Sequence, residues 1–234
     1  MILIFMEIAF YVVISAFALV SLIHLIFCLL EKEGPRKATK PLTTLLLMSA
    51  FLILVMTYPE MPFPKHAIWV AGLMCVMGDI FTLRIKSRPL FIIGSLFYTV
   101  GHILNALVML SMLSYQLPWW LYVAIAGASL LVARALFPLT RRLFGQIAYI
   151  VNLYLSLHLI NIGFSILLFL DGKPLISLLI LIGYGIYFVS DFLLVFAAYG
   201  KDMRRRDFYI MLLYYAGQIL IMLGLANTLL IISQ

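Results

Sequence analysis

Two aspartates stand inside long apolar runs of this chain, where an ionisable side chain is unusual. Asp79 follows Gly78 in the apolar run 67–83, and Asp191 follows Ser190 in a later one. A carboxyl group at membrane depth is energetically unfavourable, and such groups usually face the interior of a helix bundle and serve function. We therefore expect Asp79 and Asp191 to be catalytic residues that the rest of the chain brings together.

A pair of carboxyl groups in a low-dielectric cleft can share acid and base work. Desolvation and mutual repulsion disfavour ionisation of both groups, so one keeps its proton while the other is an anion. Acid–base catalysis in a single site needs that difference. The sequence carries no HExxH motif, no Cys/His cluster, no Ser-His-Asp spacing and none of the signatures of intramembrane aspartyl proteases.

Metal binding is a weaker alternative. His24, His102 and His158 could bind zinc together with the aspartates only if three separate helices met at one point. We therefore expect no metal and no other cofactor. The two cysteines, Cys28 and Cys75, fall in separate apolar runs, and we interpret them as small apolar residues rather than as a disulfide.

Several polar side chains could orient the carboxyl groups, a water molecule or a substrate. Tyr98, His102 and Asn105 follow one another at i, i+4 and i+7, so they lie on one face of a helix. The full set of substrate-binding candidates is Lys40, Tyr98, His102, Asn105, Tyr149, Asn152, Tyr187, Tyr214 and Gln218. His158 lies on a different face of its helix from the candidates there, and we interpret it as a packing residue.

The composition predicts a polytopic membrane protein. The chain has 234 residues, of which 65% are hydrophobic and 11% charged, and its mean hydropathy is +1.16. A soluble domain of this size could not bury so much apolar surface, and a helix needs about 20 apolar residues to cross a bilayer. We expect an all-α bundle of eight transmembrane helices that forms a single domain over residues 1–234. The expected helices are about 3–30, 41–58, 67–84, 89–113, 117–137, 143–170, 174–199 and 207–232.

Basic residues predict the orientation of this bundle. The connections after the first, third, fifth and seventh helices carry Lys32, Arg36, Lys37, Lys40, Arg84, Lys86, Arg88, Arg134, Arg141, Arg142, Lys201, Arg204, Arg205 and Arg206. By the positive-inside rule these connections face the cytoplasm and both termini lie on the non-cytoplasmic side. We expect a protein of a bacterial cytoplasmic membrane with lipids as its neighbours. Because the basic groups are divided among short loops, we expect no nucleic acid, and we infer no obligatory protein partner.

Lys40 has two open interpretations. It stands just before Pro41, a residue that suits the first turn of a helix. The lysine is either a charge that only sets topology or a clamp for the phosphate of a lipid headgroup. Both interpretations place it at the cytoplasmic mouth of the bundle.

Two segments of the chain resemble each other. Residues 98–104 read YTVGHIL and residues 214–220 read YYAGQIL, and each follows an aspartate-bearing helix and a basic loop. Because the two segments are four helices apart in the chain, the halves would share one orientation as a parallel 4+4 repeat, which often places a site between the halves. The residues expected to meet around the pseudo-two-fold axis are Asp79, His102, Asp191 and Gln218.

An ordered set of short motifs runs through nearly the whole chain. The motifs are Lys40-Pro41-Leu42, Gly78-Asp79, Gly101-His102, Ser190-Asp191 and Tyr215-Ala216-Gly217-Gln218. Together they resemble the YhhN-type lysoplasmalogenase family. The resemblance implies a membrane enzyme that hydrolyses the vinyl ether bond of lysoplasmalogens, releasing a fatty aldehyde and a glycerophospho-ethanolamine or -choline. Gln218 departs from the pattern, because some relatives have histidine there, so we assign it no proton transfer.

The chemistry implied by that resemblance suits the aspartate pair. A vinyl ether is cleaved by protonation of its β carbon, which produces an oxocarbenium ion that water captures. One aspartic acid can supply the proton while one carboxylate stabilises the cation and activates water, much as in two-carboxylate glycosidases. Which aspartate is the acid stays open.

Two other classes of function remain open. A parallel repeat with membrane-embedded acids also fits a proton-coupled membrane transporter. A binding scaffold without turnover is the third interpretation. Consumption of lysoplasmalogen by the purified protein in micelles, where no compartments exist, separates the enzyme from both.

Overall fold

The computed structural model describes residues 2–56, 62–84, 87–113, 117–199 and 204–232, and all regular structure within these ranges is helical. The helices are α1 (Ile2–Leu29), α2 (Glu33–Met56), α3 (Pro62–Thr82), α4 (Arg88–Met112), α5 (Trp119–Phe144), α6 (Ala148–Leu170), α7 (Pro174–Tyr199) and α8 (Arg206–Ile232). A short 3₁₀ turn, η1 (Gly145–Ile147), joins α5 to α6. The all-α class is thus confirmed for the described residues.

Six helical segments in the described part of the chain are long and apolar enough to cross a membrane. The longest, Trp119–Leu170, has 52 residues and contains α5, η1 and α6. A further apolar segment, His66–Thr82 of α3, is shorter than the others. The chain is therefore a multi-pass membrane protein, whereas the number of crossings and the side on which the termini lie stay predictions.

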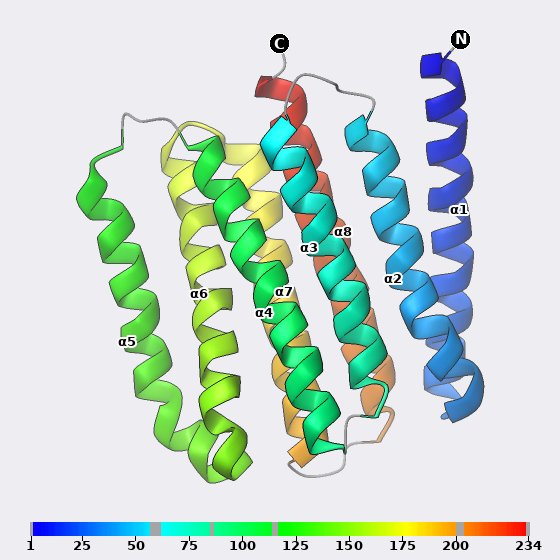
Figure 1. Ribbon diagram of the computed structural model, residues 1–234, viewed down its shortest axis with the longest axis vertical. Coiled ribbons are helices and arrows are strands. Elements are labelled where there is room, and N and C mark those ends of the chain that lie inside the picture. Colours follow the sequence, from blue (N-terminus) through cyan, green and yellow to red (C-terminus); the bar gives the residue numbers. More distant parts are fainter. Residues whose placement is uncertain (1, 57–61, 85–86, 114–116, 200–203, 233–234) are drawn as a thin grey trace.

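The helices lie side by side, with α1 at one edge of the bundle and α5 at the other (Figure 1). Most helices that follow each other in the chain pack together, most extensively α7 with α8 and α3 with α4, whereas α5 packs on α6 rather than on α4. Between the halves, α4 packs on α6, and α8 contacts α1 and α2. The aspartate-bearing helices α3 and α7 are therefore each covered by neighbours that can supply polar side chains.

α2 begins earlier than the sequence predicts. A helix from about 41 to 58 was expected after a loop, whereas α2 starts at Glu33 and has Pro41 inside it. A proline removes one backbone hydrogen-bond donor from a helix, but two electrostatic interactions stabilise the turns of α2 that precede Pro41. Glu33 stands at the positive end of the helix dipole and pairs with Lys37 one turn later at 2.9 Å. This basic stretch is thus a helix and not a loop.

α5 also extends beyond its expected end. The sequence predicts a helix over 117–137, but α5 continues to Phe144 and contains Pro138. Its last turn carries Arg141 and Arg142, and cations at this position are stabilised by the negative end of the helix dipole. Gly145, with φ of +59°, ends the helix because glycine adopts this left-handed conformation without strain.

Two further predictions are not settled by the fold. The proline-rich connection before α3 lies partly outside the described residues, which resume at Pro62. The similar segments 98–104 and 214–220 lie in α4 and α8, each packed on the aspartate-bearing helix that precedes it. The parallel 4+4 repeat stays a prediction.

Candidate functional site

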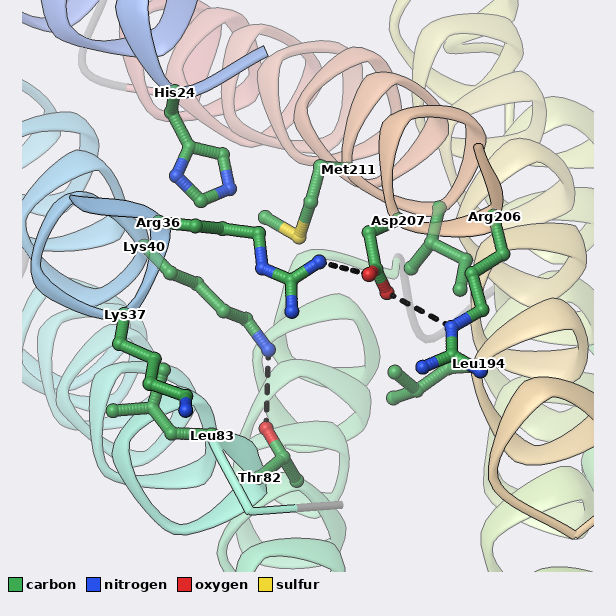
Figure 2. A pocket seen from close by; sticks show the side chains of 11 residues that line it. His24, Arg36, Lys37, Lys40, Thr82, Leu83, Leu194, Arg206, Asp207 and Met211 are labelled. Atoms are coloured by element: carbon green, nitrogen blue, oxygen red, sulfur yellow. Dashed lines mark hydrogen bonds and ion pairs between the residues drawn. The ribbon is translucent and has the colours of Figure 1, made fainter. Parts of the chain in front are cut away.

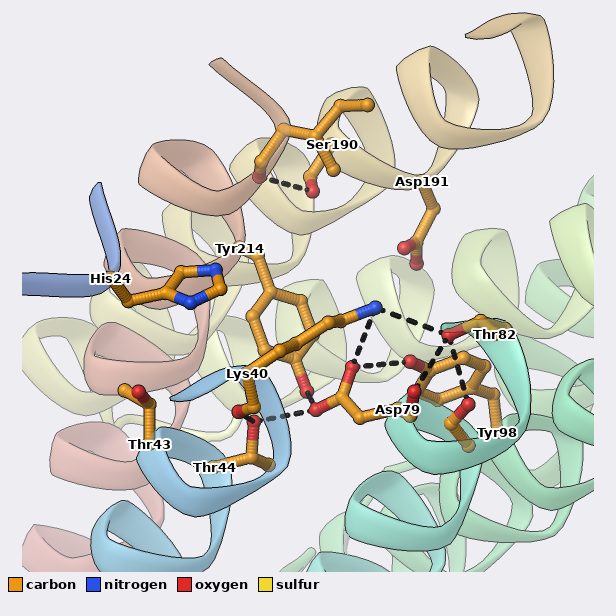
Figure 3. A network of polar contacts seen from close by, with 12 residues as sticks. His24, Lys40, Thr43, Thr44, Asp79, Thr82, Tyr98, Ser190, Asp191 and Tyr214 are labelled. Carbon is orange, nitrogen blue, oxygen red and sulfur yellow. Dashed lines mark hydrogen bonds and ion pairs between the residues drawn. The ribbon is translucent and has the colours of Figure 1, made fainter. Parts of the chain in front are cut away.

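Asp79 on α3 is fully buried, and donors occupy both of its carboxylate oxygens (Figure 3). Oδ1 accepts a hydrogen bond from the Tyr98 hydroxyl at 2.7 Å and lies 3.1 Å from Lys40 Nζ. Oδ2 accepts hydrogen bonds from Thr44 Oγ1 at 2.5 Å and from the Tyr214 hydroxyl at 3.1 Å. These donors come from α2, α4 and α8, and together with the cation they stabilise an ionised carboxylate.

Local sequence explains why these groups converge. Lys40 and Thr44 stand one helical turn apart, and because α2 starts early, both lie on helix and reach α3. Gly78 makes room on the other side, because a Cβ atom at position 78 would lie 2.6 Å from the Tyr98 ring. A side chain there would push Tyr98 away from Asp79.

Asp191 on α7 is also buried, and its neighbours come from α6 and α4. Its Oδ2 accepts a hydrogen bond from the Tyr154 hydroxyl at 2.6 Å and lies 2.8 Å from His158 Nε2. The Tyr154 hydroxyl is also 3.2 Å from His102 Nε2. The ring centroids of His102 and His158 are 4.1 Å apart. Aromatic and imidazole groups thus surround one oxygen of Asp191.

A narrow hollow separates Asp191 from the partners of Asp79. Its lining residues are Thr82, Phe91, Ser95, Tyr98, Val151, Tyr154, Asp191, Leu194 and Val195. Tyr98 binds Asp79 and Tyr154 binds Asp191, and the centroids of these two tyrosine rings are 6.2 Å apart. The hydrogen-bond partners of the two carboxyl groups are therefore neighbouring buried tyrosines. We call this space the inner hollow.

A second hollow, the basic basin, opens beside Lys40 (Figure 2). Its cavity volume is about 70 Å³, and its lining residues are His24, Arg36, Lys37, Lys40, Thr82, Leu83, Leu194, Arg206, Asp207, Ile210 and Met211. Arg36 and Arg206 both pair with Asp207, which connects the start of α2 to the start of α8. Cations outnumber the single carboxylate in this lining, so the basin favours an anionic ligand.

The basic basin and the inner hollow adjoin each other. Thr82 and Leu194 line both spaces. Lys40 Nζ, which lines the basin, donates a hydrogen bond to Thr82 Oγ1 at 3.1 Å. Figure 3 shows the Asp191 carboxyl group pointing toward the side where Lys40 and Thr82 meet. An anion in the basin would therefore lie next to Lys40, which contacts Asp79, and next to Thr82, which also lines the hollow beside Asp191.

His102, His158 and Asp191 have the composition of a metal site. Each offers one buried ligand atom, and these atoms lie within 4.8 Å of one another. Two imidazoles and one carboxylate suit zinc or iron(II). The same groups also form a hydrogen-bonded cluster with Tyr154 that needs no ion. His24 lies apart from them, at the basic basin.

Three other predicted site residues are buried but do not bond to the aspartates. Asn105, Tyr187 and Gln218 are at most 7% exposed. The Tyr187 ring centroid lies 5.1 Å from that of His158. Within the described residues, no hydrogen bond joins any of the three to Asp79 or Asp191. They stay candidates for lining a substrate path.

The structure does not bring Tyr149 and Asn152 to the aspartates. Both line a separate hollow together with Arg134, Phe137 and Arg141. Tyr149 is 64% exposed, and its ring packs on Phe137 with centroids 5.0 Å apart. The other three residues of this hollow belong to α5, so Tyr149 and Asn152 lie beside α5 and not at the aspartates.

The residues that sequence reasoning missed are Thr44, Thr82, Tyr154 and His158. His158, interpreted as a packing residue, contacts Asp191 directly. A signal was present, because residues 98–105 and 154–161 share the pattern Tyr-x₃-His-x₂-Asn. α4 and α6 pack together, so these two polar stripes meet and His102 lies against His158.

The chain belongs to the YhhN family. The family model matches residues 35–225, a range that contains Lys40, both aspartates and all of their hydrogen-bond partners. No curated protein and no solved structure matches the chain. The family expected from the ordered motifs is thus confirmed.

Proposed function

We propose that this YhhN family member is a lysoplasmalogenase-like hydrolase with Asp79 and Asp191 as its catalytic pair. It would cleave the vinyl ether bond of lysoplasmenyl-ethanolamine or -choline to a fatty aldehyde and a glycerophospho-base. Membership of the family supports a hydrolase of this kind. The substrate is the one that membership of this family implies, and the roles of the residues are inferred from the site.

The shared wall of the two hollows is the observation that carries this proposal. The basic basin gathers cations, and the inner hollow beside it touches Asp191 and the tyrosine partner of Asp79. A lysoplasmalogen has its phosphate separated from the vinyl ether oxygen only by the three carbons of glycerol. Phosphate in the basin would therefore present the reactive bond to the inner hollow.

Lys40 would connect phosphate binding with the catalytic site. Its ammonium group lies between Asp79 and Thr82 and also lines the basin. Arg36 and Arg206, oriented by Asp207, would supply further donors to the phosphate oxygens. Among the two interpretations of Lys40 that the sequence leaves open, this position supports the phosphate clamp.

Buried carboxyl groups suit the transition state of vinyl ether hydrolysis. Protonation of the β carbon makes a positively charged oxocarbenium ion, and a fixed carboxylate in a site with little water stabilises such a charge. The burial of Asp79 and Asp191 provides this low-dielectric environment. The hydroxyl donors around Asp79 are already oriented, so little reorganisation is needed during the reaction.

The direct test is aldehyde release by the purified full-length protein in detergent micelles. Lysoplasmenyl-ethanolamine is the substrate, and the matched control is the lysolipid with a saturated ether, which has no double bond to protonate. We expect aldehyde from the vinyl ether only. Fatty acid released from an ester lysolipid, without aldehyde from the vinyl ether, would contradict the proposal.

A proton-coupled membrane transporter is the second candidate, and the two buried carboxyl groups favour it. A transporter needs two compartments, so it would show no turnover in micelles. The protein reconstituted in vesicles would instead move protons together with a solute. Aldehyde release in micelles therefore decides between the two.

A further inference from the structure

The two aspartates differ in how their oxygens are occupied. All four contacts of Asp79 come from donors, two on each oxygen, and one of the donors is the Lys40 ammonium group. A proton on this carboxyl group would displace a donor and leave the buried cation unpaired. Asp79 is therefore held as an anion.

The hydrogen-bond contacts of Asp191 all involve one of its two carboxyl oxygens. Its Oδ2 interacts with Tyr154 and His158, while Oδ1 has no hydrogen bond within the described residues. Asp191 lines the inner hollow, and its carboxyl group points toward Thr82 and Lys40 (Figure 3). A proton carried by Asp191 would thus reside on Oδ1, the oxygen that is free to reach a substrate.

The direction of the hydrogen bonds at Asp191 follows from Asn161. Its amide nitrogen lies 3.3 Å from the backbone carbonyl oxygen of His102 and 3.2 Å from His102 Nδ1. The carbonyl can only accept, so this amide group donates and His102 Nδ1 accepts. The His102 proton then lies on Nε2, where it is donated to the Tyr154 oxygen.

Tyr154 and His158 consequently both donate to Asp191. Because the Tyr154 oxygen accepts from His102, its own proton is donated to Asp191 Oδ2. His158 Nδ1 has no hydrogen-bond partner in the described part of the chain, which leaves the proton on Nε2, facing Asp191. Oδ2 thus accepts two hydrogen bonds and cannot also carry the acid proton.

We propose that Asp191 is the proton donor of the reaction, that Asp79 stays an anion throughout, and that Tyr154 and His158 are positioning residues for Asp191. This assignment rests on the proposed function. Two carboxyl groups in one buried site favour a single negative charge, so one of the two keeps its proton. The assignment says which one, a question that the sequence leaves open.

The reaction begins with proton transfer from Asp191 and ends with the proton returned to it. Asp191 Oδ1–H protonates the β carbon of the vinyl ether, forming a C–H bond and an oxocarbenium ion beside the Asp79 anion. Water adds to the oxygen-bearing carbon, and the Asp191 carboxylate takes the proton that water loses. The resulting hemiacetal breaks its bond to the glycerol oxygen, which gains the hydroxyl proton, and the aldehyde leaves. Asp191 is again protonated, and one water molecule has been consumed.

Binding of a cation tests the charge assignment without turnover. The probe is a lysolipid whose vinyl ether is replaced by a protonated secondary amine, a mimic of the oxocarbenium charge. Asp79→Asn should weaken its binding about 30-fold or more, because a buried charge partner is lost. Asp191→Asn replaces a neutral acid by a neutral amide and should leave the affinity within a few-fold. Loss of affinity in Asp191→Asn alone, or in neither variant, would overturn the assignment.

Kinetics of aldehyde release test the positioning residues. Tyr154→Phe and His158→Leu should each lower kcat about 10- to 100-fold, as the loss of a hydrogen bond to an ionisable group does, while KM stays within a few-fold. His158→Gln retains an N–H donor and should recover much of the loss. Tyr184→Phe is the matched control, because its buried hydroxyl has no hydrogen-bond partner in the described residues. Equal effects of Tyr154→Phe and Tyr184→Phe would contradict the positioning role.

Metal analysis tests the alternative that His102, His158 and Asp191 bind a metal ion. The purified protein should contain no stoichiometric zinc or iron, and chelators should leave kcat unchanged. One ion per chain that His158→Leu removes would overturn the proposal, because Asp191 would then be a metal ligand. If the wild-type protein released no aldehyde, the proposed function would fail, while the amine probe would still report which aspartate carries the charge.

Discussion

The ammonium group of Lys40 lies 3.1 Å from Asp79 Oδ1, so a residue that lines the basic basin also contacts a buried carboxylate. Asp79 is fully buried, and the Lys40 side chain is only 12% exposed. A pair in this position interacts strongly because water screens it little. The contact therefore makes ligand binding in the basin and the charge of Asp79 depend on each other.

Loss of either carboxylic acid should abolish catalysis with the fold intact. We expect Asp79→Asn and Asp191→Asn each to lower aldehyde release about 10²- to 10⁴-fold, the range that acid–base groups and groups that stabilise transition-state charge contribute. Each substitution is isosteric, so detergent-solubilised protein should still elute as one species in size-exclusion chromatography. Full activity in either variant would refute the catalytic pair.

Removal of the Lys40 ammonium group should destabilise the protein, because Asp79 would then be a buried charge without its cation. Lys40→Met leaves Asp79 buried without its cation, which costs about 3–5 kcal/mol for a pair of this kind. The double variant Lys40→Met with Asp79→Asn should recover most of that stability and none of the activity. Thermal unfolding in detergent measures the stability of the single and double variants, and aldehyde release measures their activity. Additive losses of stability in the double variant would show that the two residues are not coupled.

Cations of the basic basin should act on substrate binding. Arg36→Gln and Arg206→Gln should raise KM for a phosphate-bearing lysolipid and leave kcat nearly unchanged, because these groups line the basin. The effect should shrink at high ionic strength, where salt screens exposed charges. Initial rates at low and high salt check this, and a fall in kcat without a change in KM would speak against a headgroup site.

Gly78 should tolerate no side chain. Gly78→Ala places a Cβ atom 2.6 Å from the Tyr98 ring, and overpacking of this kind costs about 1–3 kcal/mol. The shift of Tyr98 should also lower kcat, because Tyr98 donates to Asp79. Gly127→Ala is the control, since nothing lies within 4 Å of its Cβ position, and it should be neutral or stabilising.

The exposed residue Tyr149 should be dispensable. It was a substrate-binding candidate in the sequence, but it packs on Phe137 at a separate hollow. Tyr149→Phe should leave kcat and KM for lysoplasmenyl-ethanolamine unchanged. A 10-fold or larger fall in kcat/KM would mean that this hollow belongs to the substrate path.

The sequence by itself determined the features that depend on composition and local pattern. Long apolar runs predicted an all-α membrane protein, because only helices satisfy backbone donors within one segment in lipid. The rarity of charge at membrane depth singled out Asp79 and Asp191. The ordered motifs indicated the family, and the matching family model covers residues 35–225.

Only the tertiary structure decided which polar faces meet. Helical periodicity showed that α6 has two polar faces, but the face that carries Tyr154 and His158 reaches Asp191 while that of Tyr149 does not. Tyr214, on α8, donates to Asp79 rather than to the aspartate nearer in sequence. Which face of a helix turns inward depends on its neighbours, and in an apolar chain hydrophobicity differs too little between faces to reveal this.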